Sequence, residues 1–270
     1  MPGAWGRPAR ADPKPVQALR SLLFNAAMIA TAVVYSTLAV ATFPLDPMTR
    51  YRFVRQWARF IVRLLRWTCG LDFRVEGRKN LPGVPSVILS KHQSAWETIA
   101  FQEIFPPQVW VLKRELLWLP FFGWGLAMTR PIAIDRAASR RALDAIVRQG
   151  IERLEEGRWV VVFPEGTRMA PGQRGNYGPG GALLASRSGA PVVPVAHNAG
   201  EFWPRRGWIK LPGTIRVVIG PAIDSQGKSA KEINREAQAW IEGTMEEISS
   251  ETRGPRSESR PPRALGKREA

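Results

Sequence analysis

The chain has 270 residues, of which 44% are hydrophobic, so it is long enough for one substantial domain with a buried core. Its formal net charge of +16 indicates an anionic partner, such as nucleic acid, a membrane surface or a phosphorylated substrate. A single cysteine excludes an intrachain disulfide, and with only two histidines we expect no metal site.

The first 66 residues carry a net +8 of the total +16. Residues 1–18 hold four prolines among scattered basic residues, which predicts a disordered basic N-terminus. No charged residue occurs from Ser21 to Leu45, a length that can cross a bilayer core, which needs about 20 apolar residues. A buried core helix and a cleaved signal are alternatives. Basic charge beside an apolar stretch favours a lipid surface over nucleic acid.

Residues 50–67 form a second predicted helix with arginines at intervals of three or four residues: Arg52, Arg55, Arg59, Arg63 and Arg66. At about 100° per residue they lie on one side, opposite Phe, Trp and Leu side chains. This pattern predicts a helix in an anionic membrane interface, and a solvated helix packed on the core is the alternative. We therefore expect residues 19–68 to be a membrane-associated helical segment. Whether it spans the bilayer or enters one leaflet stays open, with both basic flanks expected on the cytoplasmic side.

After Gly70 the pattern alternates between strands and helices. Strands are predicted at residues 71–75, 85–89, 109–112, 131–134, 159–163, 192–195 and 214–219. Helices are predicted at residues 94–104, 137–156 and 228–248, and a further short helix is predicted to end at about residue 188. This predicts an α/β domain over residues 69–249, with a mixed, mostly parallel sheet flanked by helices. Residues 250–270 are rich in Arg, Ser, Pro and Glu, which predicts a disordered tail. The uncharged stretch 116–128 is either buried against the core, a pocket for an apolar chain or a second membrane contact.

Polar clusters follow three of the predicted strands. His92 and Glu97 follow the second strand, Asp135 and Arg136 the fourth, and residues 165–168 the fifth. In a parallel sheet the carboxyl ends of the strands share one edge, where ligands bind. We therefore expect a base, a carboxylate and cations in one cleft.

The spacing of His92 and Glu97 restricts how they can meet. Five residues at about 100° each leave them roughly 140° apart on a helix, so one helical face cannot hold both. They can meet only if His92 lies in the turn before the helix that carries Glu97. A carboxylate on one ring nitrogen would fix the tautomer and raise the basicity of the other. The alternative is that Ser94 caps the helix and Glu97 is only the acid of that capping box. His197 follows a strand without a nearby acid and is interpreted as structural.

Four blocks of the chain resemble, in order, the motif blocks of the glycerolipid acyltransferases, closest to the bacterial 1-acyl-sn-glycerol-3-phosphate acyltransferases. The blocks are His92–Glu97, Ile132–Arg136, Phe163–Arg168 and Ala190–Val195. This sequence departs from the family pattern at Glu97, where the family usually has Asp. It also departs at Arg130 and Ala133, where the family usually has Gly and Phe.

The resemblance implies an acyl transfer with His92 and Glu97 as catalytic residues. His92 would take the proton from the sn-2 hydroxyl of lysophosphatidate, and the oxygen would attack the thioester of acyl-CoA or acyl carrier protein. Glu97 would orient His92, no acyl-enzyme would form, and backbone N–H groups near the His92 turn would serve the oxyanion. The implied substrate-binding residues are Lys113, Arg136 and Arg168 on the phosphate, and Glu165, Gly166 and Thr167 in the same loop.

No cofactor is expected, and the expected partners are the acyl donor, lysophosphatidate and anionic membrane lipid, without nucleic acid. The expected location is the inner, cytoplasmic membrane with the site facing the cytoplasm. Two alternatives stay open. The acceptor can be another lysolipid, such as an aminoacyl lysolipid, or the chain can be a non-enzymatic basic protein of the membrane surface.

Overall fold

The computed structural model describes residues 14–135 and 138–253. The predicted basic N-terminus up to residue 13, Arg136 and the predicted tail beyond residue 253 lie outside the described residues. At both ends the helices run further than the sequence predicts. The first begins at Lys14, inside the segment predicted to be disordered, and the last continues to Arg253.

Seven strands of the described chain form one sheet, in the order β1-β7-β6-β2-β5-β3-β4. Neighbouring strands are parallel except β6 and β7, so the predicted mixed, mostly parallel sheet is confirmed. The strands are β1 (Leu71–Glu76), β2 (Val87–Ser90), β3 (Gln108–Lys113), β4 (Ile132–Ile134), β5 (Trp159–Val162), β6 (Val192–His197) and β7 (Gly213–Ile219).

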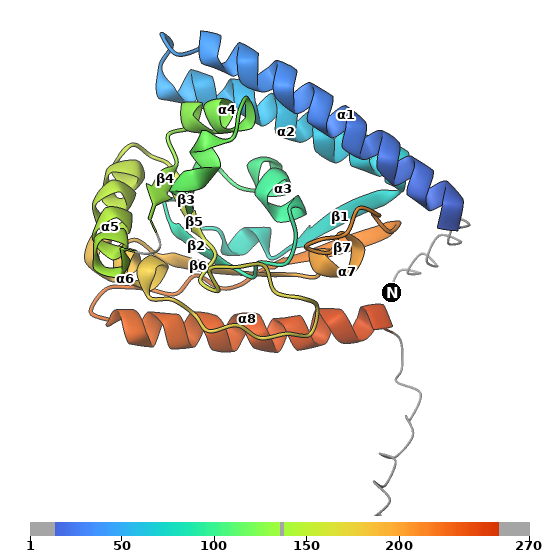
Figure 1. The fold of residues 1–270 in the computed structure, drawn as a ribbon. Helices are drawn as coiled ribbons and strands as arrows, with labels where there is room; N and C mark the ends of the chain where they lie inside the picture. The colour runs from blue at the N-terminus through green and yellow to red at the C-terminus, as the bar shows by residue number, and fades with distance from the viewer. Residues whose placement is uncertain (1–13, 136–137, 254–270) are drawn as a thin grey trace, which may run out of the picture.

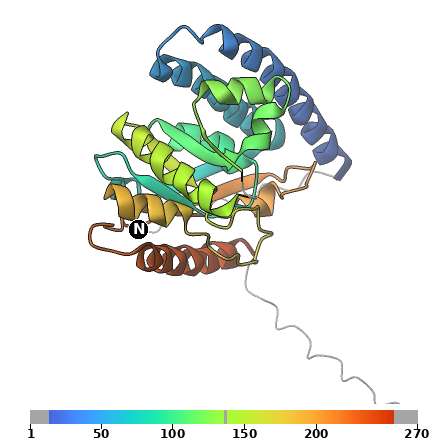
Figure 2. The same ribbon diagram turned by 60° about the vertical axis from the view of Figure 1, so that its left-hand side comes forward.

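Helices cover both faces of the sheet. Figure 1 shows α1 to α4 above the sheet and α8 below it, and Figure 2 shows α5 and α6 on the side of α8. The α-helices are α1 (Lys14–Ala41), α2 (Pro47–Cys69), α3 (Trp96–Ile104), α4 (Phe122–Met128), α5 (Ser139–Glu155), α6 (Gly180–Ser188), α7 (Ala199–Phe202) and α8 (Ala230–Arg253). Two short 3-10 helices are η1 (Arg78–Asn80) and η2 (Arg114–Trp118).

Each face of the sheet has its own apolar core. Side chains alternate along a strand, so Ile88 joins the core under α2 and α3, while Val87 and Leu89 join the core under α5, α6 and α8. Because both faces are covered, the central strands are uninterrupted runs of apolar residues rather than alternating ones. The sequence predicted these strands for that reason.

Most of the apolar side of α2 packs inside the protein, as in the alternative of a helix packed on the core. Part of it packs in the core, through the buried residues Tyr51, Ala58, Ile61, Val62, Leu65 and Cys69. Another part packs on α1, where the Phe53 ring centre lies 5.3 Å from that of Tyr35 and Trp57 Nε1 donates to Thr31 Oγ1 at 3.1 Å. Burial in protein and burial in lipid select the same residue types, so the periodicity alone did not distinguish them.

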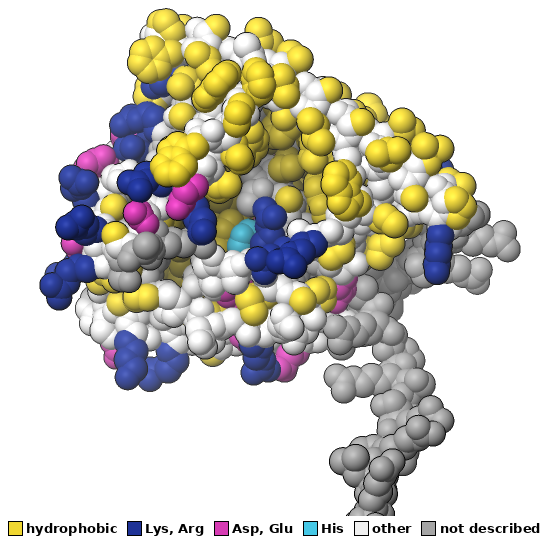
Figure 3. All heavy atoms as spheres, viewed as in Figure 1, with side chains coloured by type: hydrophobic (Ala, Val, Ile, Leu, Met, Phe, Trp, Pro, Cys, Tyr) yellow, Lys and Arg dark blue, Asp and Glu magenta, His cyan; other side chains and the backbone are white. Residues whose placement is uncertain are grey.

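Helix α1 turns an apolar surface outward instead. Its exposed apolar residues are Val16, Leu19, Leu22, Leu23, Ile29, Val33, Val34, Leu38 and Val40. Among the described residues it is the one helix that is long and apolar enough to cross a membrane. Figure 3 shows this side of the molecule as a broad apolar surface over α1, α2 and α4. The surface suggests membrane association.

A polar row on α1 ties its first half to the segment that precedes β7. Gln17, Ser21 and Asn25 are four residues apart, lie on one side of the helix and are all buried. Gln17 Nε2 donates to the Lys210 carbonyl, the Lys210 N–H donates to Ser21 Oγ at 2.9 Å, and Lys210 Nζ donates to Asn25 Oδ1. Asn25 Nδ2 donates to the Trp208 carbonyl at 3.0 Å. These bonds account for polar residues in a segment that otherwise resembles a membrane span.

Arg130 has a left-handed backbone conformation, with φ of 54°, where the chain leaves α4 for β4. This conformation is free of strain for Gly and costs another residue roughly 1 kcal/mol. This steric cost explains why the glycerolipid acyltransferases usually have glycine at this position. Here Arg130 Nη1 pairs with Glu156 Oε1 at 3.0 Å.

Lys210 should give the stability a pH dependence. Burial lowers its pKa to about 8 from an ordinary 10.5. Between these two values the unfolded chain binds the proton that the folded chain has lost, so the free energy of unfolding should rise with pH, by about 1 kcal/mol per pH unit at most. Denaturant titrations of wild type and Lys210→Met in detergent micelles, at pH 7.5 to 9.5, would measure this. Wild type should gain stability relative to the variant as the pH rises, and parallel curves would contradict the prediction.

Candidate active site

Two of the three predicted strand-end clusters meet at the carboxyl edge of the sheet. His92 follows β2 and Glu165 follows β5, and these strands are parallel neighbours with Leu89 opposite Val162. Of the third cluster only Asp135 is described; it lies apart from His92, because β4 is at the far edge of the sheet, and it pairs with Arg114 at 3.2 Å.

His92 and Glu97 are in contact. His92 lies in the turn between β2 and α3, and its Nδ1 is 2.8 Å from Glu97 Oε1. The same oxygen accepts the backbone N–H groups of Gln93 and Ser94, at 2.8 Å each. Glu97 therefore holds both the imidazole and the turn that carries it. The two interpretations of Glu97, as partner of His92 and as an acid that binds the start of the helix, describe one arrangement.

Glu97 is ionised in this environment. Its side chain is fully buried, and burial alone would raise the pKa of the carboxyl. The neighbouring imidazoles of His197 and His92 and the hydrogen bonds from His92 and the backbone N–H groups outweigh burial, so the pKa of Glu97 is below its ordinary value. The negative Glu97 Oε1 accepts a hydrogen bond from the Nδ1–H of His92, which leaves Nε2 as the basic nitrogen.

The imidazole of His92 packs on aromatic rings and is partly open to solvent. It stacks on Phe163 with ring centres 3.9 Å apart and an interplanar angle of 12°, and Phe163 stacks in turn on Trp110. The side chain of His92 keeps 14% of its surface exposed, while His197 is fully buried. Figure 3 shows a histidine in a hollow between a group of Lys and Arg side chains and the apolar surface. A substrate can reach this ring.

His197 supports the backbone beside His92. Its Nε2 lies 2.8 Å from the Lys91 carbonyl, and its Nδ1 accepts the Ala199 N–H at 3.3 Å. These contacts correspond to the neutral tautomer with the proton on Nε2. Burial lowers the pKa of His197, which agrees with a neutral ring. The structural interpretation of His197 matches this geometry.

A buried charge cluster lies directly under the His92 turn. Lys91 Nζ contacts Glu165 Oε1 at 2.7 Å and Glu242 Oε1 of α8 at 3.0 Å, and donates to the Gln173 carbonyl at 3.1 Å. The other oxygen of Glu165 accepts the His92 N–H at 3.0 Å. Burial raises the pKa of Glu165, and the ammonium of Lys91 opposes that shift. We name these three side chains, Lys91, Glu165 and Glu242, the charge cluster.

The charge cluster holds Glu165, which the resemblance places in the loop of the substrate-binding residues. Both carboxylate oxygens of Glu165 are occupied within the protein, and its side chain has no exposed surface. It positions the His92 backbone. Sequence reasoning did not single out Lys91 or Glu242. A lysine at the end of a buried strand was a usable signal for the first, whereas Glu242 is one of several acids on an amphipathic helix.

The backbone N–H groups of the His92 turn are also used within the protein. Lys91 N–H donates to the Val195 carbonyl at 3.0 Å, and the next three N–H groups donate to Glu165 and Glu97. This corrects the expectation that these groups serve the oxyanion of the reaction, because donors that already have partners are not available to it.

The loop after β5 places the remaining predicted residues. The Met169 N–H donates to the His92 carbonyl at 2.8 Å, so Arg168 lies beside the His92 turn, and Thr167 is exposed next to it. Gly166 has φ of 66°, a conformation that glycine adopts without strain and that turns the loop. Lys113 ends β3, two places from β2 in the sheet, and is exposed. Arg136 lies outside the described residues.

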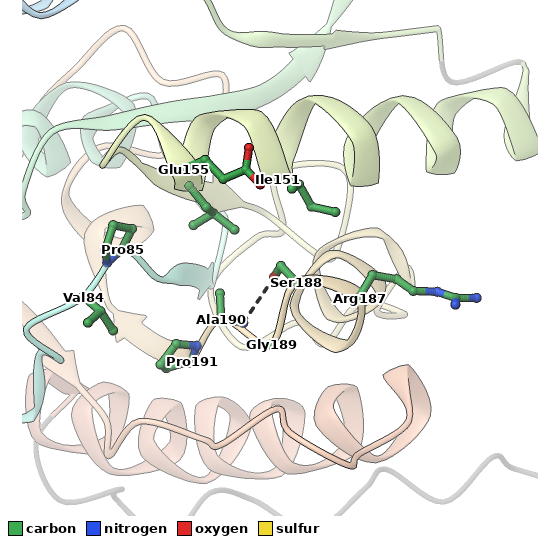
Figure 4. A pocket seen from close by; sticks show the side chains of 10 residues that line it. Val84, Pro85, Ile151, Glu155, Arg187, Ser188, Gly189, Ala190 and Pro191 are labelled. Carbon is green, nitrogen blue, oxygen red and sulfur yellow. Dashed lines mark hydrogen bonds between the residues drawn. The ribbon is translucent and has the colours of Figure 1, made fainter.

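A separate cavity of about 480 Å³ lies at the opposite edge of the sheet. It is lined by the segments that precede β2 and β6, including Pro85 and Pro191, and by Ile151 and Leu154 of α5. In Figure 4 the Arg187 side chain points away from the cavity, and Ser188 Oγ accepts the Ala190 N–H. The cavity is distant from His92 and is not part of the candidate site.

Removing the ammonium of the charge cluster should destabilise the protein. Lys91→Met leaves Glu165 and Glu242 close together without a cation, and breaking a buried ion pair costs about 3–5 kcal/mol. Denaturant titration of the purified protein would measure the loss. The matched control adds Glu165→Gln and Glu242→Gln to Lys91→Met, which removes all three charges and should recover part of the stability. Equal stability of Lys91→Met and wild type would contradict the prediction.

Comparisons with known proteins agree with the site. A family model described as Acyltransferase matches residues 72–198, which run from the second residue of β1 to just after β6 and include His92, Glu97 and the loop after β5. The 1-acyl-sn-glycerol-3-phosphate acyltransferase of Pseudomonas aeruginosa is 50% identical over 239 residues, covering 87% of this chain and 93% of the relative. The enzyme of the same name from Saccharomyces cerevisiae is 32% identical and covers 52% of this chain and 48% of the relative.

The fold is also found in a crystal structure. The 1-acyl-sn-glycerophosphate acyltransferase of Thermotoga maritima superimposes with a TM-score of 0.72, covering 88% of this chain and 98% of that chain at 22% identity. At this identity the likeness concerns the fold. The sequence matches show that the chain belongs to the acyltransferase family that includes the 1-acyl-sn-glycerol-3-phosphate acyltransferases.

Proposed function

We propose that this chain is a 1-acyl-sn-glycerol-3-phosphate acyltransferase, which forms phosphatidate in phospholipid biosynthesis. Identity of 50% over nearly the whole length of the Pseudomonas aeruginosa relative supports the reaction. The observation that carries the mechanism is the 2.8 Å contact between His92 Nδ1 and Glu97 Oε1, in a turn whose histidine is open to solvent. The acyl donor is a thioester, either acyl-CoA or acyl carrier protein.

In this mechanism His92 is the general base. Its Nε2 takes the proton of the sn-2 hydroxyl while the hydroxyl oxygen attacks the thioester carbonyl. The tetrahedral intermediate collapses with loss of the thiolate, which takes the proton from the imidazolium. Glu97 stabilises the imidazolium in between, because its negative Oε1 lies on Nδ1.

The acyl group passes directly from donor to acceptor. Ser94, the serine nearest His92 in the turn, is fully buried, and its Oγ accepts the Trp96 N–H at 3.1 Å. It therefore helps to start α3 and is not presented as a nucleophile. This argues against a serine hydrolase that would use Ser94.

The phosphate of the acceptor binds to cations beside His92. Arg168 is the principal candidate, because the Met169 N–H that follows it is bonded to the His92 carbonyl. An arginine can bind two phosphate oxygens at once. Lys113, at the end of β3, is a further candidate, and Arg136, predicted from the sequence, lies outside the described residues.

The enzyme works at the surface of the cytoplasmic membrane, with the active site facing the cytoplasm where the thioester donors are. Support comes from the outward apolar surface of α1 and from its basic flanks. Anionic membrane lipids are the expected partner of the exposed arginines of α2.

Acyl transfer from acyl-CoA and acyl carrier protein to a panel of lysolipids tests the reaction. With 1-acyl-sn-glycerol-3-phosphate, His92→Ala should lose activity by about 100-fold or more. Glu97→Gln, which cannot compensate the imidazolium, should lose more activity than Glu97→Asp, which keeps the charge. Ser94→Ala is the control and should keep most of its activity. Near-normal activity of His92→Ala, or an inactive Ser94→Ala that is folded, would contradict the mechanism.

Arg168→Ala should raise the KM for the phosphate-bearing acceptor with a smaller effect on kcat. A hydrogen bond to a charged group is worth about 1.5–3 kcal/mol, so the increase should be roughly tenfold to a hundredfold. A monoacylglycerol, which lacks the phosphate, should show no such difference between variant and wild type. Arg235→Ala on the exposed side of α8 is the matched control. An unchanged KM in Arg168→Ala would exclude this residue from the phosphate site.

A further inference from the structure

The segment between α7 and β7 exposes large apolar side chains next to arginines. In the loop of residues 204–211, here the 204–211 loop, Trp208 has 70% of its surface exposed, and Ile209 and Leu211 are exposed as well. Arg205 and Arg206 precede them and are also exposed. Contiguous exposed apolar residues in a soluble surface mark a contact site. Trp beside Arg is the composition of a membrane interface.

The loop is fixed in place against α1. The polar row of Gln17, Ser21 and Asn25 binds the backbone of Lys210 and Trp208. Lys210 Nζ lies 4.6 Å from the ring centre of Trp203, a buried residue at the start of the segment. The backbone of the loop is therefore held by the protein while its apolar side chains face outward.

The loop packs on the half of α1 that also carries exposed apolar residues. The part of α1 that binds the loop, residues 17–25, also carries the exposed Leu19, Leu22 and Leu23. Hydrogen bonds from this stretch to residues 208 and 210 hold the loop on the side of α1 that carries the polar row. At about 100° per residue, Leu22 lies next to that side of the helix, and Leu19 and Leu23 lie on the opposite side.

The other end of the loop reaches the candidate active site. Arg205 Nη1 donates to the Arg168 carbonyl at 3.1 Å. The Gly200 N–H of the preceding α7 donates to Gln93 Oε1 at 3.3 Å, beside His92. The loop thus connects α1 to the residues around His92, with its arginines at the end near His92.

We propose that the 204–211 loop is a second membrane contact, which inserts Trp208 into the interfacial layer of an anionic bilayer and places Arg205 and Arg206 among the lipid phosphates. Burial of Trp208, Ile209 and Leu211 removes apolar surface from water, and the arginines are attracted by the negative surface potential. Two contacts, α1 and the loop, fix how the domain is oriented on the bilayer, so that the hollow at His92 opens at the lipid surface.

A fluorescent label tests the position of the loop without requiring turnover. In a Cys69→Ala background, Trp208→Cys carries an environment-sensitive dye, and the protein is mixed with phosphatidylcholine vesicles with or without phosphatidylglycerol. The dye should shift to shorter wavelength and be quenched by lipids spin-labelled near the headgroup. Ala239→Cys on the exposed side of α8 is the negative control, and Leu23→Cys on α1 the positive one. Quenching at residue 23 without quenching at 208, or no vesicle binding at all, would overturn the proposal.

Vesicle partitioning measures separately how the apolar and the charged side chains of the loop contribute to membrane binding. Trp208→Glu should lower partitioning at least fivefold, while Trp208→Phe should stay close to wild type. Arg205→Glu with Arg206→Glu should lower partitioning into anionic vesicles much more than into neutral ones, and Arg235→Glu should change neither. If the double variant partitions normally and loses activity only with acyl carrier protein as donor, the arginines bind the acidic carrier and the proposal is wrong.

Discussion

The geometry of the site depends on one atom, Oε1 of Glu97, which accepts three hydrogen bonds where solvent does not reach. A buried negative charge is tolerated only when it is compensated in this way. Two of the donors belong to the backbone of the turn, and the third is the ring of His92. The start of α3, the shape of the turn and the tautomer of the base are therefore set by the same interaction.

Other buried polar contacts determine how the elements are placed on this turn. The charge cluster joins the end of β2, the loop after β5 and α8, while the polar row of α1 joins that helix to the segment before β7. The apolar cores on the two faces hold the layers together, but apolar burial has no direction. Specific hydrogen bonds and ion pairs decide which parts lie next to His92.

Much of the domain could be predicted from the sequence, because both faces of its sheet are covered and its strands are continuous apolar runs. The same logic placed His92 beside the loop that follows β5. Two features of the structure could not be predicted from the sequence in this way. The apolar side of α2 has the periodicity of a membrane-surface helix, although it packs on Tyr35 and the core. Partners distant in sequence, such as Lys91 and Glu242, meet only in the folded chain, since nothing local in α8 marks that glutamate.

The position of Glu242 has a consequence for how the protein is made. One of the two carboxylates that Lys91 contacts, that of Glu242, is synthesised 151 residues after the lysine. While the chain emerges from the ribosome, α1 is available long before α8, so the apolar surface can meet a bilayer before the charge cluster is complete. We expect the nascent chain to reach the membrane while its His92 turn is still without its full support.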